Sequence, residues 1–124
     1  MSAKQILVVD DNQLVVIAVS ALVNKCGHVP TTASSGAVAM RHLCDRTYDL
    51  VITDNCMPLP GDGIELIQFI TRKHGKDVPI ILHTADVPHD LPTLREVFPH
   101  VSVVIKTSDT PSELERVIQE KLSA

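Results

Sequence analysis

The chain has 124 residues, of which 44% are apolar and only 2% are aromatic, and its net charge is -4 at pH 7. This length predicts one domain over residues 1–124, with a core built from Val, Ile and Leu. The acidic balance argues against non-specific binding to nucleic acid or anionic lipid, and no apolar run reaches the roughly 20 residues that span a bilayer. Three cysteines without CxxC spacing predict neither a disulfide framework nor a zinc site, and they fit a reduced, cytoplasmic setting.

Strand and helix patterns alternate along the chain. Short apolar runs predict strands at residues 5–9, 29–33, 49–53, 78–83 and 101–105. Helical patterns follow each of them, at 13–26, 35–46, 63–73, 88–97 and 110–122. Five such β–α units predict an α/β fold in which a doubly wound parallel sheet carries helices on both faces. Prolines make the helix predicted at 88–97 short or irregular.

Polar residues stand where four of the predicted strands end. Asp10 and Asp11 follow the first strand, Asp54 the third, Thr84 the fourth and Lys106 the fifth. The carboxyl ends of parallel strands meet at one crevice, which is where such sheets bind ligands. We therefore expect three carboxylates, a hydroxyl and an ammonium to lie together at one edge of the sheet.

The three carboxylates predict a divalent cation site. Closely spaced carboxylates resist joint ionisation unless a cation joins them, and Mg²⁺ prefers oxygen ligands. Asp54 stands alone at the end of its strand, which makes it the better candidate for a covalent phosphoryl acceptor than Asp10 or Asp11.

The other two polar groups suit phosphoryl oxygens. Lys106 offers a compact positive charge, and Thr84 offers one hydroxyl. Ala85 is small and leaves room for an incoming group. Phosphoryl transfer needs mainly positioning and charge neutralisation, which these residues supply.

These motifs together resemble the receiver domain of two-component response regulators over the full length of the chain. The resemblance rests on Leu-Val-Val-Asp-Asp-Asn at 7–12, Asp-x-x-Met-Pro with Gly-x-Gly within 54–63, His-Thr-Ala-Asp at 83–86, and Lys106. It implies a flavodoxin-like (βα)5 fold with strand order 2-1-3-4-5.

The resemblance also implies a role in phosphorelay signalling. Asp54 would accept a phosphoryl group from a histidine kinase or a histidine phosphotransfer protein. Asp11, Asp54 and the backbone carbonyl of Cys56 would bind Mg²⁺ or Mn²⁺, with Asp10 nearby. A downstream protein would contact the face formed by the fourth helix, the fifth strand and the fifth helix. The resemblance implies a phosphoacceptor domain rather than an enzyme with an external substrate, and no effector domain is evident.

Two switch positions of the family are altered in this chain. Receivers usually carry Tyr or Phe three residues before the lysine, where this chain has Val103, and proline after the lysine, where it has Thr107. In the family, Thr84 would move toward the aspartyl phosphate and Lys106 would pair with its oxygens. The altered positions argue against the usual aromatic readout.

Two further features carry predictions. His83 is expected to be a strand residue packed under the sheet rather than a base or a metal ligand. The first helix has few polar residues, so Leu14, Val15 and Ala18 are expected either to be buried or to form an exposed strip that binds a kinase or phosphotransfer helix.

Two alternatives remain open from the sequence. A degenerate receiver would act as a phosphorylation-independent interaction module, which Val103 and Thr107 favour and the intact acidic residues oppose. A haloacid-dehalogenase-like phosphatase would need Asp-x-Asp after the first strand, whereas this chain has Asp-Asp-Asn.

Overall fold

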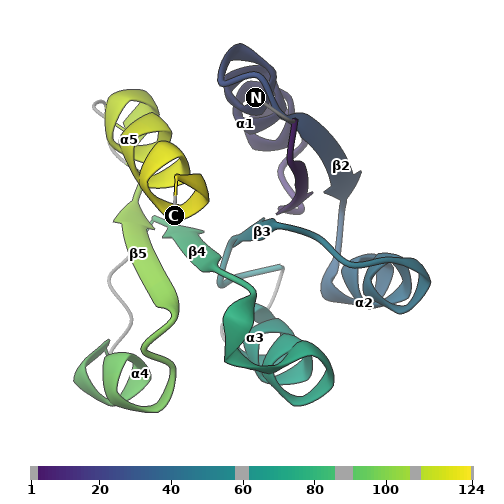
Figure 1. Ribbon diagram of the computed structural model, residues 1–124, viewed down its shortest axis with the longest axis vertical. Helices are drawn as coiled ribbons and strands as arrows, with labels where there is room; N and C mark the ends of the chain where they lie inside the picture. Colours follow the sequence, from purple (N-terminus) through teal and green to yellow (C-terminus); the bar gives the residue numbers. More distant parts are fainter. Residues whose placement is uncertain (1–2, 58–61, 86–90, 107–109, 124) are drawn as a thin grey trace.

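Figure 1 shows a computed structural model of the chain, which describes residues 3–57, 62–85, 91–106 and 110–123. The strands in these ranges are β1 (Gln5–Val9), β2 (Val29–Ala33), β3 (Leu50–Thr53), β4 (Ile80–Thr84) and β5 (Val101–Ile105). The α-helices are α1 (Gln13–Lys25), α2 (Gly36–Asp45), α3 (Asp62–His74), α4 (Leu91–Val97) and α5 (Thr110–Leu122). A 3-10 turn, η1 (Gly75–Asp77), follows α3.

All five strands form one parallel sheet in the order β2-β1-β3-β4-β5. This is the doubly wound, flavodoxin-like topology predicted from the sequence, with its switch point between β1 and β3. The central strands β1, β3 and β4 are almost wholly buried, whereas the edge strand β2 is largely exposed or half-buried. Continuous apolar runs suit strands that are covered on both faces.

Two hydrophobic clusters lie on opposite faces of the sheet. Alternate residues of β1, β3 and β4 point to each face, because the side-chain period of a strand is two. On one face they pack with residues of α2, α3 and α4, and on the other with residues of α1 and α5. Figure 1 shows the same division, with α1 and α5 on one side of the sheet and the other three helices across it.

Capping side chains and glycines mark the ends of several helices. The Asn12 side chain accepts hydrogen bonds from the N–H groups of Leu14 and Val15 at the start of α1, and Ser35 caps α2 in the same way. Gly27 and Gly75, which follow α1 and α3, have positive φ angles of 86° and 77°. This left-handed backbone conformation favours glycine and is common where helices end.

Some element ends differ from the prediction. β4 begins at Ile80 rather than residue 78, because Pro79 has no N–H to donate to the sheet. It extends to Thr84, so the hydroxyl residue is the last residue of the strand and does not follow it. The described part of the helix predicted at 88–97 is α4, a short helix as expected, and residues 88–90 lie outside the described residues. None of the described helices is long and apolar enough to cross a membrane.

Candidate functional site

Backbone hydrogen bonds hold the residues after the strands in register. The Asp10 N–H donates to the carbonyl of Ala33 at 3.1 Å, and the Asp54 N–H donates to the carbonyl of Val9 at 3.0 Å. Lys106 N–H likewise donates to the carbonyl of Thr84 at 2.7 Å. The sheet thus continues by one residue beyond several strands, and it places these side chains at the same edge.

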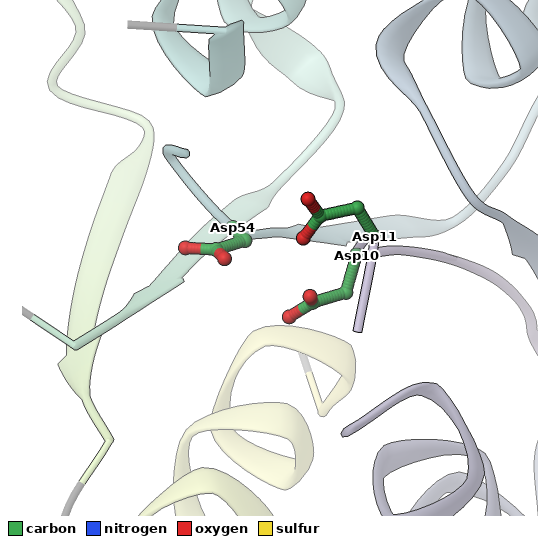
Figure 2. A group of neighbouring side chains, drawn as sticks. All are labelled: Asp10, Asp11 and Asp54. Carbon is green, nitrogen blue, oxygen red and sulfur yellow. The ribbon is translucent and has the colours of Figure 1, made fainter. Parts of the chain in front are cut away.

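Three carboxylates gather at this edge. One carboxylate oxygen from each of Asp10, Asp11 and Asp54 lies within 4.8 Å of the other two. Figure 2 shows the three side chains extending from the ends of β1 and β3 into one region. Asp10 and Asp54 are buried, whereas Asp11 is exposed. The group therefore combines two sheltered carboxylates with one that faces solvent.

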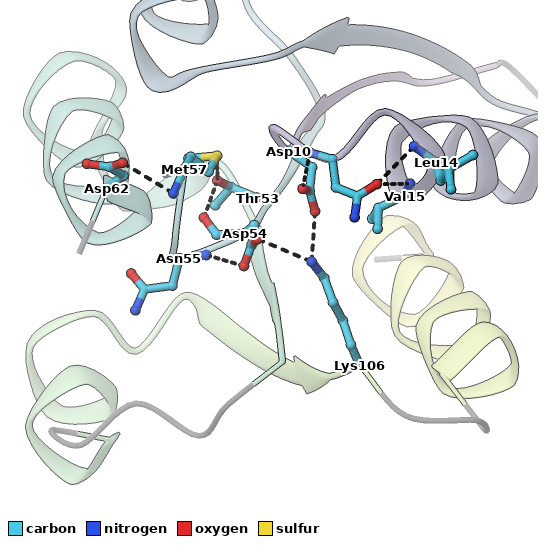
Figure 3. A network of polar contacts seen from close by, with 10 residues as sticks. Asp10, Leu14, Val15, Thr53, Asp54, Asn55, Met57, Asp62 and Lys106 are labelled. Atoms are coloured by element: carbon cyan, nitrogen blue, oxygen red, sulfur yellow. Dashed lines mark hydrogen bonds and ion pairs between the residues drawn. The ribbon is translucent and has the colours of Figure 1, made fainter. Parts of the chain in front are cut away.

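The ammonium of Lys106 joins two of these carboxylates. Its Nζ lies 2.9 Å from Asp10 Oδ2 and 3.2 Å from Asp54 Oδ2. Figure 3 shows the lysine reaching across from the end of β5 to both acids. The two pairs link residues that are 96 and 52 positions apart in the sequence. Among the described residues of this cluster, three carboxyl groups are consequently opposed by one ammonium group.

Burial and ion pairing have opposite effects on the pKa values of Asp10 and Lys106. Burial raises the pKa of Asp10, although the N–H of Asn12 and the ammonium of Lys106 both act to lower it. Burial acts to lower the pKa of Lys106, but its hydrogen bond with Asp10 and the negative charges of Asp10 and Asp54 outweigh burial and raise it. Lys106 is therefore firmly charged at neutral pH, and the cluster favours further positive charge.

The loop after Asp54 is held by polar contacts that the sequence reasoning did not identify. Asp54 Oδ1 accepts a hydrogen bond from the Asn55 N–H at 2.7 Å, and the Thr53 hydroxyl donates to the Asp54 carbonyl at 2.9 Å. Asp62, at the start of α3, accepts from the Met57 N–H at 3.2 Å. These contacts appear as dashed lines in Figure 3. The sequence signal that could have indicated the Asp62 contact is an acidic residue at the start of a helix, because acidic side chains at this position often accept hydrogen bonds from backbone N–H groups.

Gly63 lies where α3 passes close to the backbone of Asp54 and Asn55. It is the second residue of α3, and its N–H donates to the Asn55 carbonyl at 3.0 Å. A Cβ atom at this position would lie 2.7 Å from the Asn55 Cα and closer still to the Asp54 carbonyl oxygen. Only glycine therefore lets α3 approach the backbone of Asp54 this closely.

Two of the predicted site residues lie at the end of β4. Thr84 is buried at the strand terminus, and Ala85 is exposed beside it. His83 is a buried strand residue, as expected, and its side chain belongs to the sheet face that α1 and α5 cover. Burial lowers the pKa of His83 from 6.5 to about 4, with the nearby Lys106 charge adding to the effect. Its imidazole is thus neutral at pH 7.

The remaining predicted positions are Cys56, Val103 and Thr107. Cys56 is exposed in the loop after Asp54. Val103 is half-buried and packs against the cluster on the α2, α3 and α4 face. Thr107 lies outside the described residues, so its predicted role is not addressed by the structure.

The first helix presents an apolar strip to solvent. Leu14 is 77% exposed, Ala18 is exposed and Val15 is half-buried. Ile17, which the sequence reasoning did not single out, is 58% exposed. Val16, Val19 and Val23 form the buried face. The strip is therefore mostly available at the surface.

Comparisons with known proteins agree with this geometry. The family model for the response regulator receiver domain matches residues 6–98. A two-component response regulator of Oryza sativa subsp. japonica, ORR25, is 34% identical over 66% of the chain, and the CAI-1 autoinducer sensor kinase/phosphatase CqsS of Vibrio cholerae is 34% identical over 67%. The matched region makes up only 12% of either relative.

A solved structure adds a closer comparison over the whole chain. The response regulator TrrA of Thermotoga maritima, in complex with Mg(2+)-BeF, superimposes with a TM-score of 0.80 at 30% identity. The match covers 96% of this chain and 99% of that one. The fold and the acidic edge define a doubly wound signalling domain. The chain belongs to the response regulator receiver domain family of two-component systems.

Proposed function

We propose that this chain is a phosphoaspartate switch in which Asp54 accepts a phosphoryl group from a histidine kinase or a histidine phosphotransfer protein. The observation that carries the proposal is the group of three carboxylates within 4.8 Å, two of which share the ammonium of Lys106. Its excess of negative charge suits a divalent cation, and the cation in turn suits a phosphoryl group.

The donor set fits Mg²⁺ or Mn²⁺. Asp10, Asp11 and Asp54 offer carboxylate oxygens, and we assign the fourth protein oxygen to the backbone carbonyl of Cys56. Hard divalent cations select oxygen ligands and commonly use one or two carboxylates together with phosphate oxygens. The bound cation would neutralise charge on the incoming phosphoryl group. The Mg²⁺ complex of the Thermotoga relative supports the assignment.

In the proposed reaction, a carboxylate oxygen of Asp54 forms a bond to phosphorus while the phosphorus–nitrogen bond of the donor phosphohistidine breaks. The leaving imidazole keeps the electron pair and takes a proton from solvent. Lys106 and the Thr84 hydroxyl would bind the phosphoryl oxygens, and the small Ala85 would leave space for them. The protein thus contributes positioning and charge, which is what phosphoryl transfer requires.

Incubation with acetyl phosphate and Mg²⁺, followed by intact-mass measurement, tests this function. We expect one phosphoryl adduct in the wild type and none in Asp54→Asn or after chelation of the cation. Asp45→Asn is the matched control, because it removes an equal charge from an exposed site on α2. A folded wild-type protein that forms no adduct would contradict the proposal and favour the phosphorylation-independent interaction module.

We assign the docking of the phosphodonor protein to the exposed strip of α1 formed by Leu14, Val15, Ile17 and Ala18. Apolar residues at helical spacing suit the apolar face of a partner helix. Leu14→Asp and Ile17→Asp should slow transfer from a cognate protein donor and leave labelling by acetyl phosphate unchanged. Val97→Asp, on an α4 residue of similar exposure, is the control. Unchanged transfer in the α1 variants would refute the docking assignment alone.

The output of the switch is a separate part of the proposal. Val103 stands where receivers usually carry Tyr or Phe. Its small side chain packs against the core on the α4 side, so this chain has no aromatic ring at that position that could swing inward. We assign the downstream contact to the face of α4, β5 and α5, with a readout that does not depend on an aromatic rotamer. Neither nucleic acid nor a membrane is assigned as a direct partner, and the proposed setting is cytoplasmic.

A further inference from the structure

The first two residues of α3 hold the backbone on both sides of Cys56. The Gly63 N–H donates a hydrogen bond to the carbonyl of Asn55 at 3.0 Å, and that carbonyl belongs to the peptide unit before Cys56. The carboxylate of Asp62 accepts a hydrogen bond from the Met57 N–H at 3.2 Å, and that N–H belongs to the peptide unit after Cys56. Both peptide units that flank Cys56 are therefore attached to the start of α3.

The peptide unit between Cys56 and Met57 is a rigid plane, so its N–H and C=O groups cannot be oriented separately. In the usual trans form the two groups point in opposite directions. Because the Met57 N–H points to Asp62, the Cys56 carbonyl oxygen points away from that carboxylate. In the view of Figure 3, Asp62 lies on one side of Met57, and Asp54 and Lys106 lie on the other. The hydrogen bond to Asp62 thus determines which way the Cys56 oxygen points.

The two ends of this short segment are fixed by other contacts. The Met57 side chain is 4% exposed and packs in the hydrophobic cluster on the α2, α3 and α4 face. At the other end, the Asp54 N–H is bound to the carbonyl of Val9. With both ends held, the bond to Asp62 restricts rotation of the peptide plane between Cys56 and Met57.

A charged acceptor on the N–H also changes the chemistry of the carbonyl. Hydrogen bonds to ionised groups are the stronger ones, and linked hydrogen-bonding groups polarise one another. The Asp62 carboxylate therefore shifts electron density in the peptide unit toward the Cys56 oxygen, which strengthens that oxygen as a ligand for a cation. The group of three clustered carboxylates among the described residues does not include Asp62. Its effect on a cation would therefore pass through the peptide unit.

We propose that Asp62 is a positioning residue that orients and polarises the Cys56 carbonyl for binding of a divalent cation. The inference rests on the proposed function, in which that carbonyl binds Mg²⁺ or Mn²⁺. Loss of a group that orients a metal ligand typically lowers metal affinity by about 10- to 100-fold. Removal of the Asp62 acceptor should accordingly weaken Mg²⁺ binding in the absence of any phosphodonor.

Titration of the ¹⁵N-labelled protein with Mg²⁺ alone, followed by NMR, tests the proposal, and the same spectra show whether each variant is folded. We expect Asp62→Ala to bind Mg²⁺ about tenfold more weakly than the wild type. Asp62→Asn keeps an oxygen that can accept from the Met57 N–H, so its affinity should stay within about threefold of the wild type. Ser35→Ala is the control, because it removes the side-chain acceptor of the Val38 N–H at the start of α2 and should leave the affinity unchanged.

The outcomes separate this inference from the proposed function. Equal Mg²⁺ affinity of Asp62→Ala and the wild type would overturn the inference and leave the cation assignment intact. Equal weakening in Asp62→Asn and Asp62→Ala would also overturn it, because the charge of Asp62 rather than its hydrogen bond would then set the affinity. The same weakening in Ser35→Ala would refute it by attributing the effect to a general loss of stability. A folded wild-type protein without saturable Mg²⁺ binding would contradict the cation site of the proposed function, and the inference would fall with it.

Discussion

Alanine at position 63 should disturb the protein far more than alanine at position 36. Both glycines lie in the first turn of a helix, and neither has a positive φ angle. Nothing lies within 4 Å of a Cβ built on Gly36, whereas a Cβ on Gly63 meets the backbone of Asp54 and Asn55. The same substitution therefore tests the close approach of α3 to the candidate phosphoacceptor.

The expected loss of stability in Gly63→Ala follows from the overlap between the new Cβ atom and the neighbouring backbone. The Asn55 Cα would have to move by about 0.7 Å, from 2.7 Å to the 3.4 Å of ordinary contact. Overpacking of this kind costs about 1–3 kcal/mol, and the lower unfolded-state entropy of alanine returns about 0.5 kcal/mol. We expect Gly63→Ala to be destabilised by about 2 kcal/mol and Gly36→Ala to be stabilised by about 0.5 kcal/mol.

Urea unfolding of the two variants and the wild type measures both effects, provided that the slope with denaturant is unchanged. At about 3–5 °C per kcal/mol for a domain of this size, the melting temperature of Gly63→Ala should fall by roughly 6–10 °C. Displacement of the Asp54 backbone should also slow labelling by acetyl phosphate at least about tenfold. Equal stability of Gly63→Ala and Gly36→Ala would refute the reasoning.

Three other predictions concern charges at the same edge. Lys106→Met should lower the free energy of unfolding by about 1–2 kcal/mol at pH 7, with a smaller loss at pH 5, because Asp10 then protonates more easily. Urea titrations at the two pH values check this, and an equal loss at both would contradict it. The His83 pKa of about 4 lies below its ordinary value, so the unfolded chain binds this proton first as pH falls. Wild type should therefore lose up to about 3 kcal/mol relative to His83→Phe between pH 6.5 and pH 4, and parallel stability curves would argue against this. Mg²⁺ at 100 times its dissociation constant should stabilise the wild type by about 2.7 kcal/mol in thermal unfolding. Asp11→Asn should lose most of that gain and be no less stable without metal, since Asp11 is exposed among like charges.

The sequence predicted the parts of this molecule that depend on local pattern. Apolar runs in β1, β3 and β4 located the buried strands, and strand ends located Asp10, Asp54 and Lys106 at one edge. The order of the strands came from resemblance to a family, because alternation of strands and helices does not determine which strands are neighbours. The start of β4 differed from the prediction because Pro79 has no N–H to donate to the sheet.

The contacts that depend on tertiary approach could not be predicted. The importance of Gly63 comes from the Asp54 backbone that packs against it, and no local sequence pattern indicates this contact. The bond between Asp62 and the Met57 N–H depends on where α3 begins, and that end was predicted one residue late. The lack of a hydrogen-bond partner for His83 Nε2 among the described residues likewise depends on how distant segments pack together.

The long reach of Lys106 has a consequence for how the chain acquires its site. Its two ion pairs join positions 96 and 52 residues apart, and contacts of such high sequence separation form late because a large loop must close first. A nascent or proteolytically clipped chain that ends before residue 106 carries all three aspartates without their counter-charge. The full arrangement of charges at this edge therefore exists only when β5 has joined the sheet.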